Sequence, residues 1–193
     1  MTATPNDLQW PTHAPVYGAI RLRQFEDGDI PMIEELATDP YVPTIGSLPA
    51  NATTAEAQSY IDRQRCRLAE GAGFAFCVAD RQTDVALGNA GLWVRELPHG
   101  RAGVGYSVAP SARGRGVAAD ALRALAGFAW TIDGLHRLEA RIEPWNTASV
   151  RTAETAGFER EGLLRAHEEI GGRRVDLLMY SLLRPDNRSV TDN

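Results

Sequence analysis

Residues 104–126 read VGYSVAPSARGRGVAADALRALA, and this stretch decides the fold. Its first part is an apolar run of strand type, and Pro110 and two arginines form a short connector. After Gly116, apolar residues recur at the three- and four-residue steps of a helix with one buried face. The stretch therefore predicts a strand that leads through a glycine-containing turn into a long helix.

The predicted start of this helix has the chemistry of an anion site. The first four amides of a helix have no partner within the helix, and the helix dipole makes this end electropositive. Gly114 and Gly116 would let the backbone approach a phosphate closely, and Arg113 and Arg115 would add charged donors. The alternative is an ordinary helix start with a flexible, arginine-containing turn.

Two further segments accompany the turn in a recognisable order. Residues 113–118, RGRGVA, resemble the Arg/Gln-x-x-Gly-x-Gly/Ala signature of the GNAT acyltransferases. Downstream, EPWNTAS at 143–149 and AGFEREG at 156–162 are similar to the N-x-x-S and GF-x-x-EG segments of the RimJ/RimL-like branch. The resemblance spans about residues 20–185 and is strongest from Val104 onward.

This resemblance implies both a fold and an activity. The fold would be a mixed α/β fold with a central, mostly antiparallel sheet, splayed between its fourth and fifth strands and flanked by about four helices. The activity would be acyl-CoA-dependent N-acyl transfer, with acetyl-CoA as cosubstrate and a primary amine as acceptor, either a protein N-terminal α-amine or a small molecule. A homodimer is possible by family analogy.

The resemblance also implies roles for particular residues. A backbone amide near Val108 would meet the acyl carbonyl, Asn146 would bind the pantetheine arm, and Ser149 would protonate the departing thiolate. Asn146 could equally be a helix N-cap, and Ser149 an ordinary first-turn serine. The residues expected to hold the pyrophosphate are Arg113, Gly114, Arg115, Gly116, Val117 and Ala118.

The general base is harder to assign. Many RimJ/RimL-like relatives carry a glutamate before the Gly-Tyr pair of the fourth strand, but this chain has Gly103 before Val104-Gly105-Tyr106. Glu139 and Glu143 share one face of a later strand and are the candidates, although ion pairing with Arg137 or Arg141 is the alternative for each. The tyrosine acid of many GNAT proteins is also replaced, by Ala153, which favours Ser149.

Two other functions compete with this interpretation. The pattern Gly114-x-Gly116-x-x-Ala119, with Glu139 further on, also fits a dinucleotide-binding fingerprint. In that fold the first glycine follows its strand almost at once, whereas residues 110–113 intervene here, so an oxidoreductase is disfavoured. The missing tyrosine and glutamate also leave open a module that binds acyl-CoA without turning it over.

Composition limits the remaining classes. The chain has 193 residues, 44% of them hydrophobic, which fits one globular domain. Its net charge is −5 with no basic block, which argues against a general nucleic-acid binder. Cys66 and Cys77 are expected to be buried free thiols, and no metal-ligand spacing is found. The N-terminal segment lacks a signal-peptide pattern and no apolar run is long enough to span a membrane, so we expect a cytoplasmic protein.

The order of predicted elements agrees with one domain over residues 19–185, preceded by a flexible lead-in at 1–18 and followed by a mobile tail at 186–193. Acceptor recognition is expected from Thr38–Ala52, the following helix, and the closing hairpin around Leu163–Arg174, because loops on a rigid frame carry specificity. Aromatic and imidazole side chains that could line the acceptor pocket are Tyr41, Trp93, Trp145 and His167.

Overall fold

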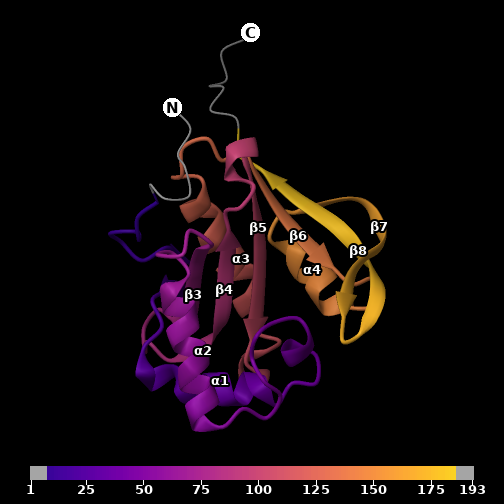
Figure 1. Ribbon diagram of the computed structural model, residues 1–193. Helices are drawn as coiled ribbons and strands as arrows, with labels where there is room; N and C mark the ends of the chain where they lie inside the picture. The colour runs from indigo at the N-terminus through magenta and orange to yellow at the C-terminus, as the bar shows by residue number, and fades with distance from the viewer. Residues whose placement is uncertain (1–7, 186–193) are drawn as a thin grey trace.

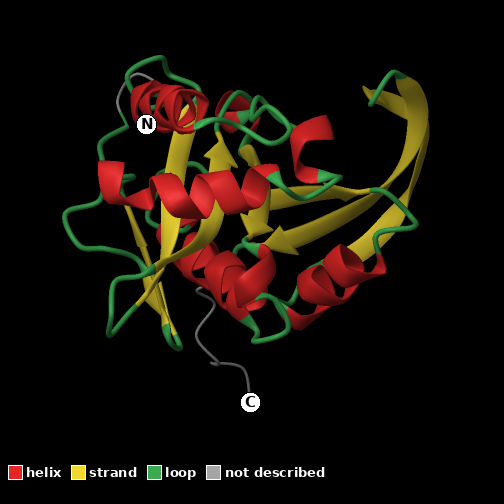
Figure 2. Cartoon of the chain, turned by 90° about the horizontal axis from the view of Figure 1, so that it is seen from below, coloured by secondary structure: helices red, strands yellow, loops and turns green. Residues whose placement is uncertain are grey.

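One eight-stranded sheet runs through the molecule, with helices on both of its faces (Figures 1 and 2). The computed structural model describes residues 8–185. The strands are β1 (Val16–Tyr17), β2 (Ile20–Arg23), β3 (Gly73–Asp80), β4 (Ala86–Trp93), β5 (Arg101–Val108), β6 (Arg137–Ile142), β7 (Glu159–Ile170) and β8 (Arg173–Leu183). The α-helices are α1 (Ile30–Ala37), α2 (Thr54–Cys66), α3 (Val117–Ala129) and α4 (Thr147–Thr155).

The sheet order is β1-β2-β3-β4-β5-β6-β8-β7, and every neighbouring pair is antiparallel except β5 and β6. Helix α3 connects these two parallel strands, as a crossover must. Their pairing covers only residues 101–103 of β5 against 137–139 of β6, although both strands continue further. Figure 1 shows the two strands diverging beyond this point. The predicted splayed, mostly antiparallel sheet with four helices is confirmed; the short β1 shifts the splay to β5 and β6.

Alternation along β3 divides the interior into two clusters. Phe74, Phe76 and Val78 point toward the larger cluster, which includes the buried face of α3. Ala75 and Cys77 point to the opposite face of the sheet, where they pack beneath α1 and α2. The period of two in a strand separates these sets, so β3 is buried on both sides. The same alternation decides which residues of β4, β5 and β6 face the α2 side.

Local signals place most element boundaries. The Thr53 hydroxyl and the Glu56 carboxylate form the predicted capping box at the start of α2. This helix ends at Cys66, before the expected Glu70, because turns bring the chain back to β3 and Gly71 adopts a φ of +68°. The expectation that both cysteines are buried is wrong for Cys66, which lies exposed on the polar side of α2, whereas Cys77 is buried.

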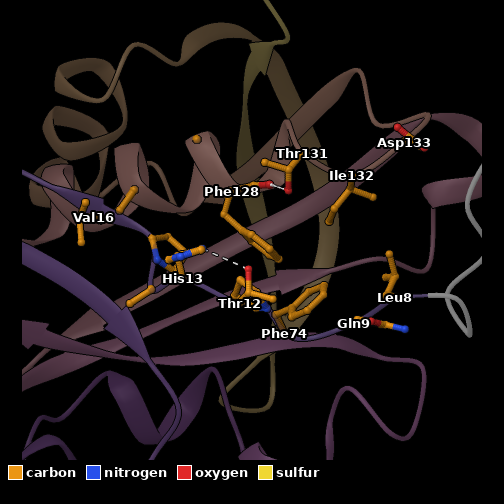
Figure 3. Close-up of a pocket in the computed structure, with 15 residues that line it drawn as sticks. Leu8, Gln9, Thr12, His13, Val16, Phe74, Phe128, Thr131, Ile132 and Asp133 are labelled. Carbon is orange, nitrogen blue, oxygen red and sulfur yellow. Dashed lines mark hydrogen bonds between the residues drawn. The ribbon is translucent and has the colours of Figure 1, made fainter.

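The N-terminal segment lies on the α3 side of the sheet. The Trp10 ring lies 4.7 Å from that of Phe76 and 6.0 Å from that of Phe74, centroid to centroid. Between residues 8–16 and α3 is a hollow of about 640 Å³, shown in Figure 3, where the Thr12 hydroxyl and His13 Nδ1 are 3.2 Å apart. No predicted site residue lines this hollow.

The expected mobile tail at 186–193 lies outside the described residues. Within 8–185, no helix has both the length and the apolar character needed to cross a membrane.

Candidate active site

The turn between β5 and α3 presents a row of backbone donors. Gly114 and Gly116 adopt φ values of +73° and +79°, which disfavour residues with a Cβ, and a Cβ at either position would meet no atom within 4 Å. Among residues 8–185, no backbone carbonyl accepts a hydrogen bond from the amides of residues 114–119. No side chain in the described part of the chain caps the helix, whose N-cap is Gly116. Free amides and open space at a helix N-terminus are the features that bind a phosphate.

Arg113 and Arg115 behave differently at this turn. The Arg113 amide donates to the Pro110 carbonyl, its Nε donates to the Val108 carbonyl at 3.0 Å, and its Nη2 lies 2.7 Å from Asp39 Oδ2. Arg113 therefore braces the turn against the segment that follows α1, while Arg115 is exposed at the rim. Burial opposes the ionisation of Asp39, but the amides of Val42 and Tyr41 and the Arg113 guanidinium outweigh it and keep the pKa of this carboxyl below its ordinary range.

The edge of β5 provides a second set of backbone groups. The Ala109 amide donates to the Leu87 carbonyl and so points toward β4. Because successive amides of a strand point to opposite edges, the Val108 amide points away from β4 and toward the splay. Val108 pairs with Gly88 on β4 but has no partner on β6, since that ladder ends at Gly103. The sequence-predicted position of this amide is thus a free strand edge.

A cleft of about 620 Å³ opens on the α2 side of the splay. Its floor comes from β4 and β5, and its walls come from β6, α2, the 41–48 segment and the tip of the β7–β8 hairpin. The cleft brings together Glu139, Asn146 and Ser149. Segments expected to recognise an acceptor also line it, as do Tyr41 and Trp93, whereas Trp145 and His167 are not among its lining residues.

The two candidate bases have different surroundings. Glu139 lies 2.8 Å from Arg137 Nε and 3.6 Å from Arg141 Nη2, so its carboxylate is already paired with cations. Glu143 follows β6, is only 6% exposed, and faces the Tyr41 hydroxyl. Burial and the Glu143 carboxylate raise the pKa of Tyr41, so the phenol keeps its proton and can donate it to Glu143. Glu143, unlike Glu139, has no cation within salt-bridge distance among residues 8–185.

Asn146 and Ser149 begin α4, where the chain leaves β6. Asn146 Oδ1 accepts a hydrogen bond from the Ser149 amide at 3.1 Å, so Asn146 is the helix N-cap. Its side-chain nitrogen donates toward the Tyr41 hydroxyl, which leaves its second N–H for a ligand. Tyr106 on β5 donates its hydroxyl to the Ser149 carbonyl at 3.3 Å, and burial raises the pKa of Tyr106. This contact joins β5 to α4 across the splay and fixes the first turn that carries the Ser149 hydroxyl.

Several cleft residues were not predicted. Gln64 comes from the last turn of α2, Arg67 is its C-cap, and Asn89 comes from β4. One signal could have found Gln64: it follows Ala57 and Ile61 at helical spacing and is therefore a polar residue on the buried face of α2. The others depend on contacts between segments far apart in the sequence.

Comparisons with known proteins identify close similarities. A family model described as an acetyltransferase (GNAT) domain matches residues 19–159. An uncharacterized N-acetyltransferase, p20 of Bacillus licheniformis, is 30% identical over 165 residues, which cover 86% of this chain and 93% of p20. The [ribosomal protein uS5]-alanine N-acetyltransferase of Escherichia coli is 30% identical over 83 residues, 43% of each chain. The solved structure of Mycobacterium smegmatis RimJ in complex with CoA-disulfide aligns with a TM-score of 0.75 and 24% identity, covering 91% of this chain and 87% of that one.

Proposed function

The chain belongs to the GNAT family and is an N-acetyltransferase, and from this premise we propose that it moves an acetyl group from acetyl-CoA to a primary amine by direct attack in a ternary complex. The observation that carries the proposal is the row of unpaired amides at residues 114–119, beside a strand edge that opens into the cleft. These groups fit a pyrophosphate followed by an extended arm.

Residues 114–118 would hold the pyrophosphate of acetyl-CoA through backbone amides, with Arg115 at the rim. Arg113 would keep the turn in place through Val108 and Asp39 while offering its remaining N–H groups to a phosphate. Asn146 would donate its side-chain amide to the pantetheine arm, because its Oδ1 is occupied by the helix cap. Acetyl-CoA itself supplies the activated thioester carbonyl.

The remaining steps are acid–base chemistry. We assign the Val108 amide as donor to the oxygen that becomes negative when the amine nitrogen attacks the carbonyl carbon. Glu143 would take the proton released by the amine, relayed through the Tyr41 hydroxyl, which keeps its own proton until then. As the carbon–sulfur bond breaks, Ser149 would pass its hydroxyl proton to the leaving thiolate while its oxygen takes up a proton from solvent water, so that thiol forms and no alkoxide remains. Glu139 is the weaker candidate for the base because two arginines already neutralise it.

The acceptor class proposed here is a protein N-terminal α-amine or a small-molecule amine. Glu168 and Glu169 line the cleft at the tip of the β7–β8 hairpin, where Arg141 also lines it, and Glu143 lies buried beside the Tyr41 hydroxyl, outside the cleft lining. An ammonium group would be attracted there before it loses its proton. The E. coli relative is named for an N-terminal alanine, which is consistent with an α-amine acceptor.

The test is calorimetric titration with acetyl-CoA, CoA and NAD, followed by thiol release with a broad panel of amines. We expect micromolar binding of acetyl-CoA and CoA, no binding of NAD, and amine-dependent thiol release. Absence of CoA binding would refute the donor-site assignment. Tight CoA binding with no thiol release for any amine would refute transfer as the activity and leave a binding module.

A further inference from the structure

The end of the cleft beneath α2, which we call the inner chamber, is built from Tyr60, Gln64, Arg67, Asn89 and Trp93. Gln64 is only 5% exposed. Its Oε1 accepts a hydrogen bond from Arg67 Nε at 2.7 Å, but its Nε2 has no partner among the described residues. A buried donor without an acceptor costs about 1–3 kcal/mol, so this group favours a ligand that supplies one.

Arg67 adds positive charge at the same place. It is half-buried, and within residues 8–185 no carboxylate lies within 4 Å of its guanidinium. Its Nε donates to Gln64, and its two terminal nitrogens have no hydrogen-bond partner among residues 8–185. When no protein carboxylate is paired with them, the two terminal nitrogens of an arginine can bind a carboxylate of a ligand through two parallel hydrogen bonds.

Tyr60 and Asn89 complete a set dominated by donors. Asn89 Nδ2 donates to the Tyr60 hydroxyl at 3.0 Å, so the phenolic oxygen is an acceptor there and its own proton remains available. Burial raises the pKa of Tyr60, which keeps that proton in place. The Gln64 amide, the Arg67 guanidinium and the Tyr60 hydroxyl are therefore all hydrogen-bond donors that line the same cleft.

The floor beside these donors is flat and apolar. The Trp93 indole is 41% exposed and lies over strand glycines; a Cβ at Gly105 would come within 2.7 Å of its ring, and one at Gly91 within 3.2 Å. Only glycine at these positions leaves room for the ring to lie against the sheet. The indole thus provides a platform for an apolar or planar group in the same cleft as the donors and the glutamates of the hairpin tip.

We propose that the inner chamber binds the carboxylate of an acceptor whose amine lies at the other end of the same molecule, with its apolar body on Trp93. The inference rests on the proposed acetyl transfer and adds the substrate class: an amine separated from a carboxylate by an apolar or aromatic spacer, as in a dipeptide. Negative charge meets Gln64 and Arg67, while positive charge meets the glutamates near Tyr41. The opposite orientation would place like charges together at both ends.

Two matched pairs of acceptors test this directly. They are L-alanyl-L-phenylalanine with its C-terminal amide, and 4-(aminomethyl)benzoate with 4-(aminomethyl)benzamide, so each pair differs only in the carboxylate. Thiol release from acetyl-CoA gives kcat and KM for each compound. We expect kcat/KM for at least one acid to exceed that of its amide by about tenfold or more, since a hydrogen-bonded charge contributes roughly that much.

Two variants then test whether the preference for the acid over its amide depends on the inner chamber. Gln64→Met and Arg67→Gln should each raise KM for the preferred acid by about tenfold, leaving kcat, its neutral amide and acetyl-CoA binding unchanged. Gln58→Met is the control, because Gln58 lies on α2 outside the cleft lining and, within residues 8–185, its side chain hydrogen-bonds only to the exposed Asp27 and Asp62. Calorimetry with the N-acetylated acid and amide measures the same preference without turnover, and it remains informative if one variant folds poorly.

The outcomes separate this inference from the proposed function. Equal kcat/KM for acids and amides, turnover confined to the amides, or no binding of the N-acetylated acids overturns the carboxylate site. The carboxylate site is also overturned if Arg67→Gln lowers kcat/KM equally for the acid and for its amide. Failure of the proposed function is different, because it would remove thiol release for every amine tested.

Discussion

The turn at residues 113–118 and the inner chamber beneath α2 are two polar sites built in opposite ways. The turn offers backbone amides in open space, and its two glycines have no atom within 4 Å of a Cβ position. The chamber offers side chains in a buried space, where Gln64 is almost fully enclosed and Gly105 could not gain a methyl group without moving Trp93. One site excludes side chains to expose its donors; the other depends on them.

This difference matches the ligand that each of the two sites would have to recognise. A pyrophosphate presents the same oxygens whatever amine is acetylated, so backbone amides suffice and their number matters more than the identity of neighbouring side chains. An acceptor differs from one enzyme to another, and only side chains can be changed without altering the strand and helix that carry them. We therefore expect substitutions at the turn to affect donor binding and substitutions in the chamber to affect acceptor choice.

The largest effect should come from Gly116→Asp. A carboxylate at the start of α3 would face the bound phosphates, and we expect acetyl-CoA affinity to fall by at least about 100-fold. Gly116→Asn is the matched control, because asparagine tolerates the same positive φ but adds no charge. Calorimetry distinguishes them. Equal, small losses in both variants would show that the turn does not hold the pyrophosphate.

The next effect concerns the two candidate bases, Glu139 on β6 and Glu143 just after it. Glu143→Gln should lower kcat by about 100-fold with acetyl-CoA affinity unchanged, because removal of a general base typically costs at least this much. Glu139→Gln should lower kcat by less than about threefold, since its carboxylate serves Arg137 and Arg141. Steady-state kinetics at saturating acetyl-CoA measures both. A reversed order would make Glu139 the base.

This contrast also shows how far the sequence could reach. The turn, the helix starts and the strand pairing depend on neighbouring residues, so the capping box at Thr53 and the glycines at 114 and 116 could be interpreted directly. Glu139 and Glu143 look alike in sequence, because both alternate with arginines on one strand face. Their difference arises from Tyr41, more than a hundred residues upstream, and from Arg137, which also pairs with Glu161 on β7. The inner chamber joins α2 and β4 by the same kind of distant contact.

A smaller effect should follow from Gly105→Ala, which tests whether Trp93 is a platform. The new methyl group would lie 2.7 Å from the indole ring and must displace it, and we expect KM for the preferred acceptor to rise by about tenfold. Gly103→Ala on the same strand is the control, because its Cβ would lie 3.7 Å from the ring, an ordinary contact. Acetyl-CoA affinity should stay the same in both. An unchanged acceptor KM in Gly105→Ala would remove Trp93 from the acceptor site.

The smallest effect should come from Asp39, which links the donor turn to the segment that lines the acceptor side of the cleft. Asp39 accepts the amides of Tyr41 and Val42 through Oδ1 and pairs with Arg113 through Oδ2, so one carboxylate links the acceptor segment to the donor turn. Asp39→Asn can keep the turn contacts but loses the charge, and we expect about a threefold weakening of acetyl-CoA binding and a similar rise in acceptor KM. A double-mutant cycle with Arg113→Gln should show that the two losses are not additive.

The contribution of Asp39 to the free energy of unfolding should depend on pH in one direction. Because the pKa of Asp39 is lowered in the folded protein, its stabilising contribution is complete above the ordinary aspartate pKa of about 4 and is lost as pH falls further. The difference in unfolding free energy between wild type and Asp39→Asn should therefore be constant from pH 6 to 8 and shrink below about pH 4. Denaturant titrations at these pH values measure it. A difference that grows on acidification would mean that the folded state favours the protonated Asp39 carboxyl over the carboxylate. The donor turn and the acceptor segment would then be positioned independently of this ion pair.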